Sequence, residues 1–348
     1  MSFTLNVLFY SCTTEMDIPE TPSIEGGVKV SFVLNTSSSR AIGNGELDDG
    51  FYWERYIDPT DIRVFVFTAD DKYQEEITRF ILNGTDGDAT RTFTGTMKSA
   101  YTGKQIQLVV LTNMRNRGVT NSITLVAGKT TKKELYGQLV FKYDTAWSFS
   151  ENEKNYIPMW GISKKFSIQA ELNNAGQIDM YRAVAKIDIQ VNGGDGIDGF
   201  KIKKLELYNV PDCGYCASLE TPNEDNTIQF ETPSLPKSMK AIETAIQVFE
   251  SVEGEDRKIE NKIYVPEMVS FNPYPYFKIQ IYATVNNKER TYDLYMRENQ
   301  IDLLSGLEII RNHKYIINIE TITATDEVKM VYNVNTWGEG TNVDIPFN

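Results

Sequence analysis

The sequence predicts an all-β protein made of two antiparallel β-sandwich domains in tandem. Apolar and polar residues alternate with a period of two through most of the chain, whereas sustained 3.6-residue periodicity is scarce. Many short strands follow one another without the strand–helix–strand rhythm of a parallel sheet. The chain has 348 residues, and this length suits two domains of about 150 to 200 residues, each with its own core.

The first predicted strand covers residues 27–35. Val28, Val30, Phe32 and Leu34 lie on one of its faces, and mostly polar residues lie on the other. Because successive side chains of a strand point to opposite faces of a sheet, these four side chains should enter the core of the first sandwich.

The remaining elements follow from the same patterns. Residues 61–67 and 105–111 are almost continuously apolar, which predicts central strands covered on both faces. The second half continues the strand pattern and helical stretches are few: we expect strands at 201–208, 277–285 and 314–320, and helical turns only at 132–140 and near 236–242.

The domain boundary is placed at a polar cluster of turn residues, 171–177, after which a new long strand should begin at Ile178. A glycine-rich segment further on is interpreted as a loop inside the second domain. The predicted organisation is a leader and tether at 1–26, an N-terminal sandwich at 27–176, and a C-terminal sandwich at 177–348 that contains the loop at 193–199.

The leader is interpreted as a truncated lipoprotein signal. An apolar run at residues 3–11 ends in a small residue just before Cys12, as a signal peptide ends at its cleavage site, but the positively charged start is missing. We therefore expect Cys12 to be the lipidated residue, the alternative being that the run is an ordinary apolar strand. No later apolar stretch approaches the ~18 to 20 residues that a membrane-spanning helix needs.

Charge and cysteine content exclude several classes of function. The formal net charge is −13, and no long basic run is present, so nucleic acid is not an expected partner. Three cysteines are too few for a disulfide framework or a closed structural zinc site. Cys213 and Cys216 have the spacing of a redox pair, but they follow a strand that ends at Pro211, and so they are interpreted as a loop pair.

No enzyme, metal or cofactor site is predicted. His313 is the only histidine, the acids Glu46, Asp48 and Asp49 are too close in sequence for a glycosidase pair, and residues 83–88 lack the spacing of a calcium loop. Two interpretations stay open for the aromatic run at 271–277, which either stacks against sugars or simply leads into the next strand.

Four short motifs resemble the fimbrillin family, the subunits of type V pili on Gram-negative gut and oral anaerobes. They occur in the expected order and span most of the chain: IPMWG at 157–161, YRAVAKIDI at 181–189, YIINI at 315–319 and VNTW at 334–337. The resemblance implies transthyretin-like sandwiches and a surface assembly protein that is exported as an outer membrane lipoprotein precursor and ends in a fimbrium.

The resemblance also implies a processing site. In fimbrillins an arginine-directed protease removes the first strand after export, and Arg40 and Ala41, in a serine-rich segment, resemble that site. Loss of residues 27–35 would leave an acceptor groove in the first sandwich, which a strand of a neighbouring subunit could fill by β-augmentation.

The expected donor strand lies near the C-terminus. Val328, Met330, Tyr332 and Val334 repeat the four-residue apolar pattern of the strand that they would replace. The expected partners are other pilus subunits, an arginine-specific protease and a host protein or glycan. Stalk, tip and anchor subunits would share the fold, and the tail favours a stalk; the competing interpretations are a tip adhesin and a surface glycan-binding lipoprotein.

Overall fold

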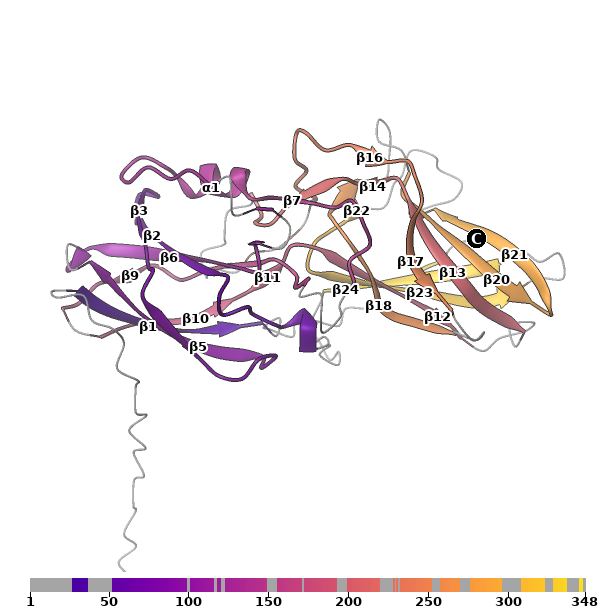
Figure 1. The fold of residues 1–348 in the computed structure, drawn as a ribbon, viewed down its shortest axis with the longest axis horizontal. Coiled ribbons are helices and arrows are strands. Elements are labelled where there is room, and N and C mark those ends of the chain that lie inside the picture. The colour runs from indigo at the N-terminus through magenta and orange to yellow at the C-terminus, as the bar shows by residue number, and fades with distance from the viewer. Residues whose placement is uncertain are drawn as a thin grey trace, which may run out of the picture.

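The computed structural model describes residues 27–36, 52–98, 101–115, 118–119, 123–148, 155–170, 172–192, 199–219, 228, 230, 232–251, 257–269, 276–295, 308–322, 328–336 and 344–346. Figure 1 shows an elongated molecule in which two β-rich lobes lie end to end. The described chain is almost entirely β, with a single α-helix among the described residues. The prediction of an all-β fold is therefore confirmed.

The N-terminal lobe is a sandwich of two sheets. The first sheet has the order β10 (Asn173–Asp179), β1 (Gly27–Asn35), β5 (Thr90–Lys98) and β4 (Phe80–Asn83). The second has the order β11 (Tyr181–Arg182), β8 (Met159–Ile162), β6 (Gln105–Thr112), β2 (Ile62–Thr68) and β3 (Tyr73–Glu76), and β9 (Phe166–Ser167) also pairs with β6.

The outer face of the second sheet is covered by the helix α1 (Lys132–Gln138), whose Leu135 and Tyr136 are buried. Thr131 caps the helix, because its hydroxyl accepts from the Glu134 amide while the Glu134 carboxylate accepts from the Thr131 amide at 2.8 Å. Strands β2 and β6 are thus covered on both faces, as their nearly continuous apolar sequence predicted.

The C-terminal lobe is a second sandwich. One sheet has the order β18 (Lys258–Val265), β12 (Ala185–Val191), β23 (His313–Ile322), β24 (Val328–Thr336) and β25 (Asp344–Pro346). The other has the order β17 (Ile246–Glu250), β13 (Phe200–Tyr208), β20 (Lys278–Val285) and β21 (Lys288–Tyr295).

Short elements complete the lobes. The short 3₁₀ turn η1 covers Tyr52–Glu54. Three two-stranded ladders pair β14 (Val210–Pro211) with β16 (Ala241–Ile242), β15 (Cys213–Tyr215) with β7 (Val140–Lys142), and β19 (Met268–Val269) with β22 (Glu308–Ile309). Because β15 belongs to the second half of the chain and β7 to the first, this ladder joins the two lobes. One cluster of buried apolar side chains accordingly runs from beneath α1 into the C-terminal sandwich.

Two expectations about local structure are wrong. Residues 173–177 do not form a turn, because they belong to strand β10, which pairs with β1. Near 236–242 the chain forms a turn, in which the Met239 amide donates to the Pro236 carbonyl at 3.0 Å, and then strand β16. The sheets are mostly antiparallel, as predicted, and include two parallel pairings, of β1 with β10 and of β12 with β23.

The chain leaves the first sandwich between β11 and β12. Strand β11 pairs with β8 of the N-terminal lobe, whereas β12 is the first strand of the C-terminal lobe. The two sheets of the N-terminal sandwich come very close here, since a Cβ added to Gly161 would lie 2.5 Å from the Asp179 carbonyl oxygen. The glycine of the IPMWG motif is therefore required by packing. The division at 176 and 177 stays a prediction.

Candidate functional site

The first strand, β1, supplies one stripe of the N-terminal core. The exposed fractions of Val28, Val30, Phe32 and Leu34 are 2%, 0%, 1% and 0%. All four belong to the apolar cluster between the two sheets of this sandwich. The ring of Phe32 stacks on that of Phe93 with 4.4 Å between the centroids. The alternating sequence therefore placed these side chains on the core face correctly.

The backbone of β1 is paired along both of its edges. It runs antiparallel to β5 through nine residue pairs, from Gly27 with Lys98 to Asn35 with Thr90. On the other edge it runs parallel to β10, with a register shift between Ser31 and Val33. Removing β1 would therefore leave unpaired donors and acceptors on both β5 and β10, together with an open stripe of core.

The end of β1 is held at the junction of the two lobes. The Arg182 guanidinium donates to the Thr36 carbonyl at 3.1 Å through one Nη and to the Glu54 carbonyl at 3.0 Å through Nε. The exposed fraction of Arg182 is only 1%. The Met180 amide also donates to the Asn35 carbonyl at 2.8 Å. One buried side chain thus ties the end of β1 to η1 and to the chain between the lobes.

A buried ion pair lies beside this clamp. Lys186 Nζ is 3.0 Å from Glu54 Oε1, and the side chains are 1% and 0% exposed. The Tyr264 hydroxyl donates to the same carboxylate oxygen. Burial, with Glu54 alongside, raises the pKa of Tyr264 well above its ordinary value, so this hydroxyl keeps its proton.

The buried Asp188 and the partly buried Lys314 continue the junction on the C-terminal side. Lys314 Nζ lies 3.2 Å from Asp188 Oδ2, and the Asn261 amide donates to Asp188 Oδ1 at 3.0 Å. Burial raises the pKa of Asp188 against the opposing effect of the neighbouring lysines. The buried Arg311 pairs with Glu267 at 2.5 Å. We refer to Glu54, Arg182, Lys186, Asp188, Tyr264 and Lys314 as the junction cluster.

The junction cluster was not singled out from the sequence. Arg182, Lys186 and Asp188 all lie in the YRAVAKIDI motif, where charged residues interrupt an otherwise apolar strand. Such charges are normally solvated, and only partners that are distant in sequence reveal their burial. The presence of charged residues within an apolar strand was the one signal in the sequence that could have indicated the junction cluster.

The structure describes only some of the remaining predicted functional residues. Cys12, Arg40 and Ala41 lie outside the described residues. Val328, Met330, Tyr332 and Val334 lie in β24, which pairs antiparallel with β23 from His313 with Thr336 to Ile322 with Val328. Strand β25 pairs with β24 in turn. The predicted donor strand is therefore part of a sheet of its own sandwich, at the opposite side of the junction from β1.

The two described cysteines are free and buried. They follow β14, and β15 begins at Cys213, so no helix opens at the pair. Burial, with Asp212 alongside, raises the pKa of Cys213 to about 12, and burial raises that of Cys216 as well. Both thiols are therefore protonated at neutral pH, which suits inert residues rather than a redox pair. The expected loop pair is wrong for Cys213, which lies in β15 and pairs with Lys142 of β7.

We expect these two thiols to react slowly in the folded protein. In a Cys12→Ser chain at pH 8, a thiol-specific reagent such as DTNB should modify them at least about a hundredfold more slowly than in the unfolded chain, because few thiolates are present. Stopped-flow absorbance with and without guanidinium measures the ratio. Equal rates would contradict the buried, protonated state.

His313 and the acids of the segment 83–88 make ordinary structural contacts in the described part of the chain. His313 Nδ1 contacts the Arg311 carbonyl at 2.8 Å, and desolvation lowers the pKa of the imidazole. The acidic segment forms a hairpin turn between β4 and β5, where Asp86 pairs with Arg91 at 2.9 Å. No group of three or more potential metal ligands occurs among the described residues. Most of the aromatic run at 271–277 lies outside them.

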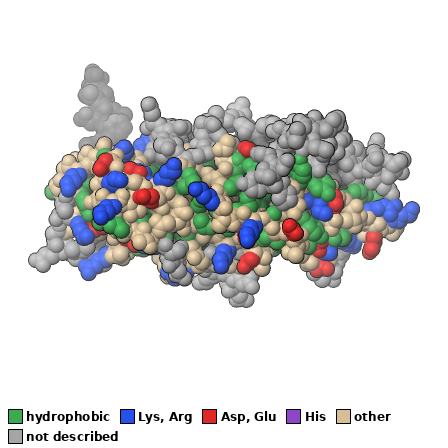
Figure 2. Space-filling view, turned by 90° about the horizontal axis from the view of Figure 1, so that it is seen from above, with side chains coloured by type: hydrophobic (Ala, Val, Ile, Leu, Met, Phe, Trp, Pro, Cys, Tyr) green, Lys and Arg blue, Asp and Glu red, His purple; other side chains and the backbone are tan. Residues whose placement is uncertain are grey.

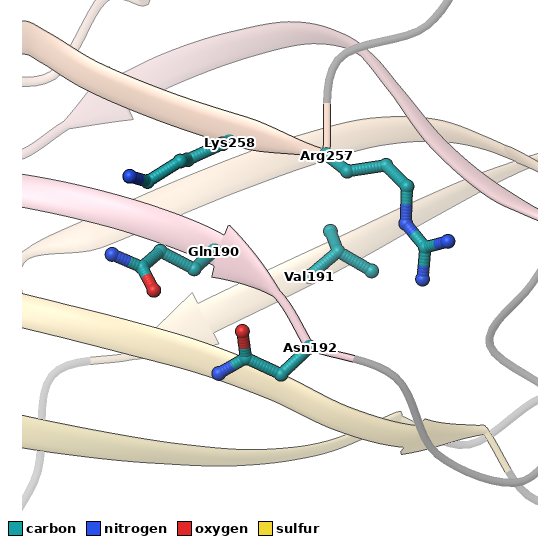
Figure 3. A pocket seen from close by; sticks show the side chains of 5 residues that line it. All are labelled: Gln190, Val191, Asn192, Arg257 and Lys258. Carbon is teal, nitrogen blue, oxygen red and sulfur yellow. The ribbon is translucent and has the colours of Figure 1, made fainter.

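The surface has mixed charge. Figure 2 shows acidic and basic side chains interspersed over the visible face. A hollow of about 410 Å³ opens at the end of the C-terminal sandwich, where β12 ends and β18 begins. In Figure 3 the Lys258 and Gln190 side chains point away from Arg257, so the cations around this hollow do not converge. No described helix is both long and apolar enough to cross a bilayer.

Comparisons with known proteins identify a family and a similar fold. Residues 55–343 match the family model of the fimbrillin-A associated anchor proteins Mfa1 and Mfa2. A fimbrial assembly protein from Parabacteroides distasonis has a similar structure, with a TM-score of 0.51, 12% identity, and coverage of 88% of this chain and 95% of that one.

A second similar structure is that of a Bacteroides eggerthii protein described as a cell adhesion protein. Its TM-score is 0.48 at 11% identity, and the alignment covers 90% of this chain and 97% of that one. Among curated proteins, none matches the sequence. At 12% identity, the likeness to the Parabacteroides distasonis protein supports the fold alone.

Proposed function

This chain belongs to the family of fimbrillin-A associated anchor proteins Mfa1 and Mfa2, and from this premise we propose that it is a structural subunit of a type V pilus. The family gives it a pilus-associated role in adhesion at the cell surface. The family and the similar structures are fimbrial and adhesion proteins rather than enzymes, which supports a function without catalysis.

The proposed assembly mechanism is strand exchange after removal of β1 at Arg40 and Ala41. The observation that supports it most is the position of β1, which is paired along both edges and buries four side chains in the N-terminal core. A replacement strand would recover four buried side chains at roughly 1.5 to 3 kcal/mol each, or about 6 to 12 kcal/mol before the cost of ordering it. Junctions of this strength would be long-lived.

The proposed donor is β24, with Val328, Met330, Tyr332 and Val334 as the side chains that enter the groove. In the uncut chain β24 is paired with β23, so donation requires this ladder to open first. A free subunit would therefore hold its donor strand in its own sheet until a groove is offered, which would oppose premature assembly.

The remaining parts of the proposal concern attachment and partners. Cys12 would carry the lipid of an outer membrane precursor, and other pilus subunits, an arginine-specific protease and a host protein or glycan would be the partners. These assignments are supported by the apolar run before Cys12, by the serine-rich segment around Arg40 and by the family.

We expect Arg40→Ala to abolish both processing and assembly. Limited digestion with an arginine-specific protease should release a fragment ending at Arg40 from the wild-type chain and allow a ladder of oligomers on a non-boiled gel. The variant should give neither, because the bond is no longer recognised. Arg79→Ala is the matched control, since Arg79 is exposed between two strands, and it should behave as wild type.

The family description also favours a second role, that of an anchor, which would keep its lipid and its first strand. The same digestion separates the roles. A wild-type chain that stays uncut at Arg40 and monomeric would contradict strand exchange and leave an anchor or a glycan-binding lipoprotein. A cut chain that accepts a strand but cannot donate one would be a tip adhesin.

A further inference from the structure

The outer face of the sheet β17-β13-β20-β21 carries a connected set of polar and aromatic side chains. The hydroxyls of Tyr282 and Tyr208 lie 2.9 and 3.0 Å from Glu206 Oε2. Lys204 Nζ lies 2.9 Å from Glu206 Oε1. Gln280 Nε2 donates to Asp293 Oδ1 at 2.7 Å, which extends the contacts from β20 to β21.

Two lysines hold the rings of these tyrosines in place. Lys204 Nζ lies 4.0 Å from the ring centre of Tyr282, and Lys278 Nζ lies 4.3 Å from that of Tyr208. Although partial burial opposes ionisation, hydrogen bonds from Lys204, Tyr282 and Tyr208 hold the pKa of Glu206 below its ordinary value. This face is therefore ordered before any ligand arrives, which lowers the entropy cost of binding.

One end of this network forms the wall of a hollow of about 470 Å³. The hollow lies where β13 has a register shift relative to β20, between Ile202 and Lys204, which locally disrupts the regular ladder. The residues that matter to its chemistry come from four neighbouring strands: Lys204, Glu250, Tyr282, Glu289 and Thr291.

The lining combines an aromatic ring with fixed donors and acceptors. Lys204 can only donate hydrogen bonds, and Glu250 and Glu289 can only accept them when ionised. Sugar hydroxyls do both, and the apolar C–H face of a sugar ring fits against an aromatic side chain such as Tyr282. An anionic ligand would instead meet two glutamates. The size of the hollow is in the range of small-molecule sites, about 300 to 1,000 Å³.

We propose that this hollow binds a neutral glycan, with Tyr282 as its contact for the sugar ring. The proposal rests on the proposed role in surface adhesion, because a glycan on the host or on a neighbouring cell would be its natural ligand. It places sugar binding on a sheet face of the C-terminal sandwich, whereas β1 lies in the N-terminal one.

The test is a titration of the purified, uncut chain. Lactose, maltose and N-acetylglucosamine serve as neutral probes and glucuronic acid as an anionic one, with isothermal titration calorimetry as the measurement. At least one neutral probe should bind, and Tyr282→Ala should weaken its affinity at least about tenfold. Thr291→Trp should abolish binding without disturbing the network, because Thr291 is exposed on β21 and a larger side chain there would fill the hollow.

Tyr208→Ala is the matched control. Tyr208 shares Glu206 with Tyr282 and has the same kind of lysine contact, but it does not line the hollow. Its loss should change the affinity by less than about twofold. The proposal is overturned if no neutral probe binds at concentrations up to about 20 mM, if only glucuronic acid binds, or if both tyrosine variants weaken binding equally.

The outcome is independent of strand exchange, because the titration needs neither cleavage nor assembly. A chain that binds sugar but resists cleavage at Arg40 would contradict the strand-exchange mechanism and leave the glycan site standing. A chain that polymerises but binds no neutral sugar would contradict the glycan site and leave the strand-exchange mechanism standing.

Discussion

Replacing Glu54 by alanine should lower the free energy of unfolding by about 3–5 kcal/mol. The Glu54 carboxylate neutralises Lys186 at 3.0 Å and accepts from Tyr264, and both members of the ion pair are almost completely buried. Without it, a buried ammonium group and a buried hydroxyl lose their partner at the junction between the lobes. Urea unfolding followed by tryptophan fluorescence gives the change in the midpoint.

The double variant Glu54→Ala with Lys186→Met should be clearly more stable than Glu54→Ala alone. Methionine fills much of the lysine volume and carries no charge, so the unpaired ammonium group disappears. Lys98→Ala is the control for an ordinary ion pair, since Lys98 is 65% exposed and 3.7 Å from Glu75; its effect should stay within about 0.5 kcal/mol. A similar small effect for Glu54→Ala would show that water reaches the junction cluster.

Phe32→Ala should lower the free energy of unfolding by about 3–5 kcal/mol as well. The Phe32 side chain is 1% exposed and stacks on Phe93, whose ring in turn stacks on Phe80 with 4.7 Å between centroids. Truncation leaves a cavity at one end of this row, which the two sheets cannot close without moving. Differential scanning calorimetry and urea unfolding of the uncut chain measure the loss.

Lys29→Ala is the matched control on the same strand, because Lys29 lies on the opposite face and is half-buried. It should change stability by less than about 0.5 kcal/mol. The comparison also bears on assembly, since a weakened β1 should leave its sheet more readily after cleavage. If Phe32→Ala were as mild as Lys29→Ala, β1 would contribute little to the N-terminal core and its removal could not open a useful groove.

The elements of the fold were largely predictable because they depend on local sequence. The alternation of Val28, Val30, Phe32 and Leu34 predicted β1 with its observed bounds, and the core face was correct. The capping residues Thr131 and Glu134 act within one turn of helix, and α1 appeared where it was expected. The short motifs predicted the family, which the match over residues 55–343 confirms.

Side-chain periodicity, charge and short motifs are properties of neighbouring residues, and they were enough to predict most of the strands, the buried face of β1, the acidic net charge and the family. The folded structure was needed to show that β10 takes the place of the expected turn and runs parallel to β1, that β24 lies in its own sheet, and that Glu54 and Lys186 form a buried pair. Arg182 meets Thr36 across 146 positions of sequence and Glu54 across 128. Burial and pairing over such distances depend on which surfaces the whole chain brings together, and local patterns carry no information about them.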